Sequence, residues 1–162
     1  MPSVHRYRTT VRWTGDLGDG TREYRGYSRD HVIETDGKPP ILASSGLSPR
    51  SDPGRHNPDE LLVAALASCH MLWYLHLCAE AGVTVVAYSD RAEGTLETAA
   101  DGSGRFVSAT LRPCVVVRDG SSERARELHE LAHRKCFVAN SVAFPVTVEP
   151  VIERETTGVA PG

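Results

Sequence analysis

The hydrophobic and polar positions in the first third of the chain are typical of strands and turns. Residues 4–14 and 23–35 are rich in β-branched and aromatic side chains, and each predicts a strand. A segment rich in Gly and Asp, residues 15–20, predicts the turn between them. Residues 44–56 are mostly Ser, Pro, Gly, Asp and Arg, so they predict an irregular surface loop.

The longest apolar stretch, residues 61–79, predicts a long central helix. Asn57 suits the N-cap and Pro58 the first helical position, and the two acidic residues that follow suit the positive end of the helix dipole. Gly82 predicts the C-terminal end of the helix. The apolar residues surround this helix on all sides, which is typical of a helix at the centre of a protein core.

The same stretch is nineteen residues without a formal charge, which meets the length requirement of a membrane span. Its flanks disagree with that interpretation. Acidic residues border it on both sides, neither end has a Lys or Arg anchor, and His70 and His76 interrupt it. We therefore expect a core helix of a soluble protein.

The second half of the chain alternates strand and helix patterns again. Its predicted elements are a long β-hairpin over 84–99 and 105–118, a helix from Ser121 or Ser122 to about Arg134, a helical turn near 136–142 and a last strand over 145–152. The element order ββ–α–ββ–α–β predicts one α+β domain over residues 1–162, with mostly antiparallel strands.

Composition narrows the class of protein. The 162 residues are 40% hydrophobic and 24% charged, with a formal net charge of −3, so a globular chain is expected and a nucleic-acid partner is not. No apolar segment of a signal peptide follows the N-terminus, so we expect a cytoplasmic protein without membrane association. Structural disulfides are rare in that compartment, and no CxxC pair suggests a zinc site among the four cysteines.

The four cysteines differ in their surroundings. Cys69 lies in the middle of the central helix, and Cys78 lies nine positions further, on the opposite face, where it is expected in the core. Cys114 falls in a strand. Cys136 follows the basic run 133–135 and precedes a helical turn, and both features favour the thiolate.

Two segments in this order resemble the signatures of the OsmC/Ohr family. One is residues 57–69, NPDELLVAALASC, and the other is residues 132–142, AHRKCFVANSV. The resemblance covers essentially the whole chain, and residues 27–31 are more similar to the OsmC-like branch than to typical Ohr proteins. It implies an OsmC-like fold: mostly antiparallel sheets around a long central helix, in an intertwined homodimer.

The resemblance also implies an activity, which is reduction of organic hydroperoxides without metal, haem or flavin. Cys69 matches the peroxidatic thiol, which becomes a sulfenic acid. Cys136 matches the resolving thiol, which condenses with it to a disulfide that an external dithiol reduces. This assignment agrees with general thiol chemistry, since thiolate is the nucleophile and a nearby second thiol prevents over-oxidation.

The family places an arginine and a carboxylate beside the reactive thiol. The carboxylate matches Asp59, and the arginine matches Arg29 or Arg50, of which we favour Arg29 in the predicted second strand. About 15 Å of helix axis separates Asp59 from Cys69, too far for direct assistance within one helix. Either the arginine bridges a long distance or a second subunit completes the site, as the implied homodimer allows.

Other residues near Cys69 leave alternatives open. His76 lies within about 20° of Cys69 around the helix, so it suits either the thiol pocket or a metal site, but we expect both His76 and His70 to be hydrogen-bonded core histidines. Trp73 and Met71 suit an apolar pocket or core packing. Two rival functions remain: a non-catalytic OsmC-fold dimer that binds an apolar ligand or partner, and metal binding through Cys69, His70 or His76.

Overall fold

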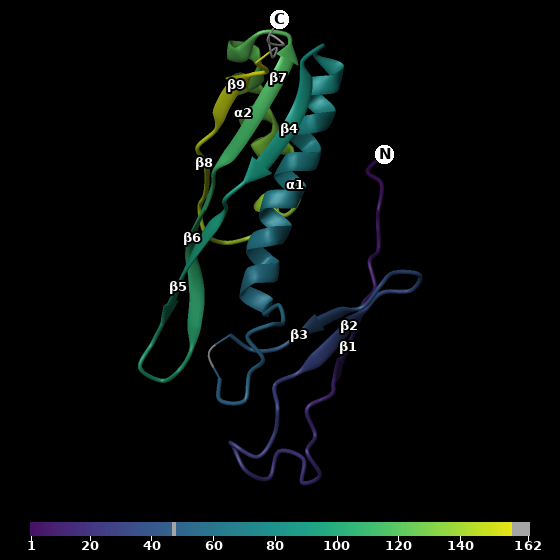
Figure 1. Cartoon of the computed structure of the whole chain (residues 1–162), viewed down its shortest axis with the longest axis vertical. Coiled ribbons are helices and arrows are strands. Elements are labelled where there is room, and N and C mark those ends of the chain that lie inside the picture. The colour runs from purple at the N-terminus through teal and green to yellow at the C-terminus, as the bar shows by residue number, and fades with distance from the viewer. Residues whose placement is uncertain (47, 157–162) are drawn as a thin grey trace, which may run out of the picture. The chain divides into compact units, whose positions relative to one another are not determined.

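The computed structural model describes residues 1–46 and 48–156 (Figure 1). By its internal contacts the chain divides into two compact units, residues 1–62 and the chain from residue 63 onward. Each unit is described by itself below. The α+β class is confirmed, because both units contain β-sheet and the chain has two long helices, α1 (Pro58–Glu80) and α2 (Ser122–Lys135).

The first unit contains a small antiparallel sheet in the order β1-β2-β3. Its strands are β1 (Thr10–Trp13), β2 (His31–Glu34) and β3 (Ile41–Ala43). The first two are much shorter than predicted: the strands expected over 4–14 and 23–35 end within one residue of the expected place, but each starts at least six residues later.

Hydrogen bonds in the loop between β1 and β2 explain why these strands are short. The Asp16 carboxylate accepts hydrogen bonds from the backbone N–H groups of Gly18 and Gly20, both of which have positive φ. The Trp13 indole N–H donates to the Ser28 carbonyl at 2.8 Å, which closes this loop at its base. These local bonds replace the strand pairing that β-propensity alone predicted.

Helix α1 (Pro58–Glu80) agrees with its predicted start and end. The Asn57 side chain accepts from the Glu60 N–H at 2.9 Å, and the Glu60 carboxylate accepts from the Asn57 N–H at 3.3 Å. This reciprocal pair is a capping box. Gly82 has φ 68°, the left-handed conformation that commonly follows a helix end.

The second unit is built on the predicted hairpin, which the structure divides into two paired sections. The strands are β4 (Thr84–Asp90), β5 (Glu93–Thr98), β6 (Gly104–Leu111) and β7 (Pro113–Asp119). Strand β4 pairs with β7 and β5 pairs with β6, both antiparallel. At the break, the Arg112 N–H donates to the Asp90 carboxylate at 2.7 Å.

Helix α2 (Ser122–Lys135) is capped by Ser121 and is followed by the short 3₁₀ helix η1 (Ala139–Ser141). The predicted last strand is two strands, β8 (Val146–Val148) and β9 (Val151–Arg154). They add in parallel to β6 and β7, which gives the sheet orders β5-β6-β8 and β4-β7-β9. Pro150 lies between them and has no N–H to continue a ladder.

The main core of the second unit lies where α1 and α2 pack against β7 (Figure 1). Its largest members are Tyr74 and Leu77 of α1, Val115 and Val117 of β7, and Leu128 of α2. A smaller cluster joins Leu66 of α1 to Ala109 and Leu111 of β6. The two clusters fix one face of α1 against the rest of the unit.

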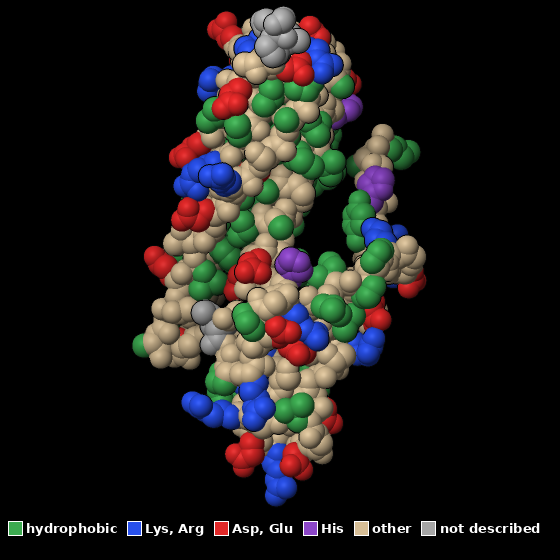
Figure 2. All heavy atoms as spheres, in the orientation of Figure 1, with side chains coloured by type: hydrophobic (Ala, Val, Ile, Leu, Met, Phe, Trp, Pro, Cys, Tyr) green, Lys and Arg blue, Asp and Glu red, His purple; other side chains and the backbone are tan. Residues whose placement is uncertain are grey.

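The opposite face of α1 is open within this chain. Leu72 is 63% exposed, and Phe137, which follows α2, is 68% exposed. Figure 2 shows hydrophobic side chains at the surface of the part of the chain that contains α1 and the hairpin. By length and composition α1 also passes the test for a membrane-crossing helix, a test that the central helix of a soluble protein passes as well.

Candidate active site

The structure brings two of the predicted site residues together. Cys69 lies in the middle of α1 and is half-buried, whereas Cys136 immediately follows α2 and is fully buried. The two thiols lie close enough together for Cys69 to act on the titration of Cys136. Cys78 is buried in the core and Cys114 lies in β7, as predicted for both.

The Cys136 thiol is held in its neutral form. Burial raises its pKa to about 11 and the nearby Cys69 acts in the same direction, against an N–H···S bond of 3.5 Å from Ala139. The expectation that the preceding basic run favours thiolate here is therefore wrong. Arg134 and Lys135 are exposed, so their charges remain in water and do not offset the loss of solvation at the buried sulfur.

A hollow of about 510 Å³ opens beside Cys69. Its lining is almost entirely apolar and includes Leu72, Trp73 and His76 of α1 together with Phe137 and Val138. The expectation that Trp73 lines an apolar pocket is confirmed. Met71 does not line it, since its position on α1 turns it away from this face.

Aromatic side chains form one wall of the hollow. The Trp73 ring meets Phe137 edge to face at 5.5 Å between centroids, and meets His76 in the same way at 5.7 Å. His76 is exposed and its Nε2 lies 3.4 Å from the Glu80 carboxylate. The expectation of a buried core histidine is thus wrong for His76, because it lies on the open face of α1.

For His70 the same expectation is confirmed. Its ring is fully buried, and its Nε2 lies 2.9 Å from Nδ1 of His129 in α2. Desolvation lowers the pKa of His70 to about 4 and that of His129 to about 3, so both rings are neutral near pH 7. Sequence reasoning missed His129, although its spacing from Ala125, Leu128 and Ala132 places it on the apolar face of α2.

The predicted arginine and carboxylate lie in the first unit. Arg29 precedes β2 instead of lying within a strand, and it donates to the carbonyls of Tyr27 at 2.7 Å and Tyr24 at 2.8 Å. Its guanidinium also stacks over both tyrosine rings.

Arg50, the alternative arginine, donates to the Arg25 carbonyl. Asp59, in the first turn of α1, lines a small hollow of about 240 Å³. The catalytic roles of Arg29, Arg50 and Asp59 stay predictions.

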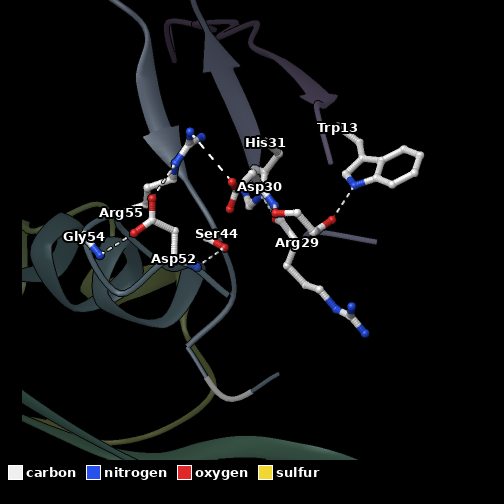
Figure 3. Close-up of polar contacts among 9 residues, drawn as sticks. Trp13, Arg29, Asp30, His31, Ser44, Asp52, Gly54 and Arg55 are labelled. Carbon is white, nitrogen blue, oxygen red and sulfur yellow. Dashed lines mark hydrogen bonds and ion pairs between the residues drawn. The ribbon is translucent and has the colours of Figure 1, made fainter. Parts of the chain in front are cut away.

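Sequence reasoning also missed an ion-pair cluster in the loop before α1 (Figure 3). The Arg55 guanidinium lies 3.2 Å from the Asp52 carboxylate and 3.8 Å from that of Asp30. The Asp52 carboxylate also accepts from the Gly54 N–H at 2.8 Å. In Figure 3 the Arg29 side chain extends away from this cluster. These bonds tie the irregular loop to the start of β2.

Within residues 1–46 and 48–156, no group of three or more His, Cys, Asp or Glu side chains is arranged to hold a metal ion. The alternative of a metal site at Cys69, His70 and His76 therefore has no ligand set in this part of the chain. The geometry of His70 and His76 explains this result, since one ring faces the core and the other the open face of α1.

Comparison with known proteins gives a family match. Residues 51–151 match the family described as OsmC-like protein. An OsmC-like protein of unknown function from Vibrio cholerae is 34% identical, with a TM-score of 0.83, over 91% of this chain and 100% of that one. A search of curated proteins found no match.

Two organic hydroperoxide resistance proteins share the fold at lower identity. The protein from Elizabethkingia anophelis is 16% identical with a TM-score of 0.66, over 96% of this chain and 100% of that one. The protein from Bacillus subtilis is 20% identical with a TM-score of 0.58, over 94% of this chain and 100% of that one.

Proposed function

The chain belongs to the OsmC-like protein family, and we propose that it is a thiol-dependent peroxidase that reduces organic hydroperoxides. The observation that carries this proposal is the contact between the Cys69 and Cys136 thiols beside an apolar hollow. Two solved structures with the same fold are named organic hydroperoxide resistance proteins, which supports the substrate class.

In the proposed reaction the Cys69 thiolate attacks the O–O bond of a hydroperoxide. One oxygen stays on sulfur as a sulfenic acid, and the other leaves with the organic group as an alcohol after taking a proton. The Cys136 sulfur then attacks the Cys69 sulfur, a disulfide forms and water leaves. An external dithiol reduces this disulfide in two exchange steps and is itself oxidised.

The environments of the two thiols support this division of roles. Cys69 lines the hollow, where a peroxide can reach it, whereas Cys136 is buried behind it. The raised pKa of Cys136 keeps it protonated and weakly nucleophilic, so Cys69 is the thiol that is proposed to attack the peroxide. A cytoplasmic location suits this chemistry, since reducing thiols are available there.

Arg29 and Asp59 are proposed to assist Cys69, the arginine by favouring its thiolate and the carboxylate by orienting the arginine. This part of the proposal rests on the family resemblance. A second copy of the chain is proposed to complete the assembly, since Leu72 and Phe137 leave the open face of α1 apolar and uncovered within one chain. Such a face costs free energy in water unless it is buried.

The test of the activity is consumption of cumene hydroperoxide by the reduced protein with a dithiol present. Cys69→Ser should abolish turnover. Cys136→Ser should allow one turnover, stop cycling and leave Cys69 open to sulfinic acid formation. Cys114→Ser is the matched control, since Cys114 lies in β7 and should keep the wild-type rate. Wild-type activity in Cys69→Ser would end the peroxidase proposal.

A second candidate function is binding of an apolar ligand without catalysis, which the size and apolar lining of the hollow favour. This function differs from the peroxidase proposal because it does not need the two thiols. A ligand-binding protein should bind an apolar fluorescent probe equally well before and after Cys69→Ser, and should consume no hydroperoxide in either form.

A further inference from the structure

The buried pair His70 and His129 joins the two helices that carry the thiols. The rings are nearly parallel, with 7° between their planes, and the Nε2 of His70 lies 2.9 Å from the Nδ1 of His129. Their exposed fractions are 0% and 2%. Among the residues that the structure describes, no other side-chain hydrogen bond joins α1 to α2. The remaining contacts between the helices are apolar packing, the stack of Tyr74 on His129 and the Lys135 ammonium over the Trp73 ring.

The pair is placed close to both sulfurs along the chain. His70 directly follows Cys69 in α1. His129 precedes Cys136 by seven residues, which is two turns of helix, so it lies on about the same side of α2. His70 and Cys69 are neighbours on one rigid helix. The orientation of α1 that places His70 against His129 therefore also places Cys69 against Cys136.

Stacking holds His129 in place as well. The Tyr74 ring, one turn after His70 on α1, lies 3.8 Å from the His129 ring centroid and within 10° of parallel. His129 is thus fixed by a ring from α1 on one side and by a hydrogen bond to α1 at its Nδ1. Apolar packing alone tolerates sliding of one helix along another, whereas a directional hydrogen bond with a stacked ring does not.

We propose that His70 and His129 are positioning residues that hold Cys69 and Cys136 in the register needed for disulfide formation. This inference rests on the proposed function. A disulfide demands a narrow range of separations between the two residues, so a small shift between α1 and the end of α2 slows the second chemical step. The first step needs only Cys69 and the hollow, so the same shift leaves it unchanged.

The pair performs this role as two neutral rings. A hydrogen bond between imidazoles needs one ring nitrogen without a proton as acceptor. The charged or titratable groups that face the pair are His133 and Arg126 of α2 and Tyr74 of α1. Burial is the main cause that lowers the pKa values of both rings, and His133 and Arg126 act in the same direction. Both rings therefore keep the bond at the neutral pH where thiol chemistry runs.

The experiment separates the two chemical steps in four variants. His129→Leu removes the hydrogen bond and replaces the ring with an apolar side chain of similar size. His129→Asn and His70→Gln are the conservative variants, since their amide groups can occupy the positions of Nδ1 and Nε2. Leu128→Ala is the matched structural control, since it opens the same core without touching the bond.

Single-turnover mixing with cumene hydroperoxide gives the rate of sulfenic acid formation, and mass analysis gives the rate of Cys69–Cys136 disulfide formation. We expect His129→Leu to slow disulfide formation about tenfold with an unchanged first step, and to raise the fraction of Cys69 in the sulfinic form. The two amide variants should recover most of the disulfide rate, and Leu128→Ala should keep it. Equal slowing in Leu128→Ala, or an unchanged rate in His129→Leu, overturns the proposal.

A second oxidant keeps this test independent of peroxidase activity. Diamide oxidises two neighbouring thiols to a disulfide and is itself reduced to the hydrazine, so no peroxide is needed. If the wild type ignores hydroperoxides but forms the disulfide with diamide, the proposed function fails and the positioning role is still measured. The same tenfold loss in His129→Leu then supports the positioning role, and its absence contradicts it.

Discussion

The two faces of α1 have similar amino-acid composition and very different surroundings. One face carries His70, Tyr74 and Cys78, all buried against α2 and the β4-β7-β9 sheet. The other face carries Cys69, Leu72 and His76, which line an open hollow or are exposed. Both faces contain a cysteine and a histidine, so residue type does not separate structural from chemical positions here. The structural positions are those that other helices and strands cover, and the chemical positions are those left open.

The largest expected effect of this difference is on stability. Tyr74 is fully buried among core residues, so Tyr74→Ala should lower the free energy of unfolding by about 3–5 kcal/mol. Leu72→Ala on the open face should cost far less in a dilute sample. Urea unfolding at low protein concentration measures both, and equal losses would contradict the contrast between the faces.

The next effect concerns pH and belongs to the buried face. The pKa values of His70 and His129 in the folded chain, about 4 and about 3, lie below the value near 6.5 in the unfolded chain. Between those pH values the unfolded chain therefore binds more protons than the folded chain. The stability that depends on these neutral rings is complete above pH 6.5 and is lost as pH falls. At pH 5 the loss should be about 2 kcal/mol for each histidine.

Urea unfolding of the wild type and of the double variant His70→Gln/His129→Asn, from pH 7.5 to pH 5, checks this expectation. The double variant has no titrating group at these positions, so its stability should change less over that range. The same pH dependence in both proteins would contradict this assignment to His70 and His129.

The smallest effect belongs to the open face and concerns substrate choice. Phe137 forms part of the apolar wall with Trp73, so Phe137→Ala should lower kcat/KM for cumene hydroperoxide about fivefold, or about 1 kcal/mol. The rate with hydrogen peroxide, which has no apolar group, should change little. Equal losses with both peroxides would mean that Phe137 acts on the thiol and not on the organic group.

Local signals explain which parts of the fold could be predicted from the sequence. Asn57, Pro58 and Gly82 define the ends of α1 through bonds and backbone angles within a few residues, so its limits were predicted correctly. Strand limits depend on partners far away in the chain. The sequence at 4–9 and 23–27 has strand propensity but no pairing partner in the sheet, so it is not strand.

The site shows the same division between local and distant causes. The cysteine assignments came from motifs, and the structure brings Cys69 and Cys136 together. The expected direction of the Cys136 pKa is wrong because its neighbours in sequence, Arg134 and Lys135, are exposed to water while burial acts on the sulfur. His129 was missed since its partner His70 lies 59 residues away, and no local pattern marks such a pair.

The parallel pairing of β8 and β9 has a consequence for synthesis of the chain. Both strands come after α2, yet they complete the edges of β6 and β7, which leave the ribosome much earlier. Until residue 154 has emerged, the hairpin therefore has unpaired N–H and C=O groups along its free edges. A nascent chain arrested before residue 145 therefore exposes those edges to other chains, and exposed strand edges favour aggregation.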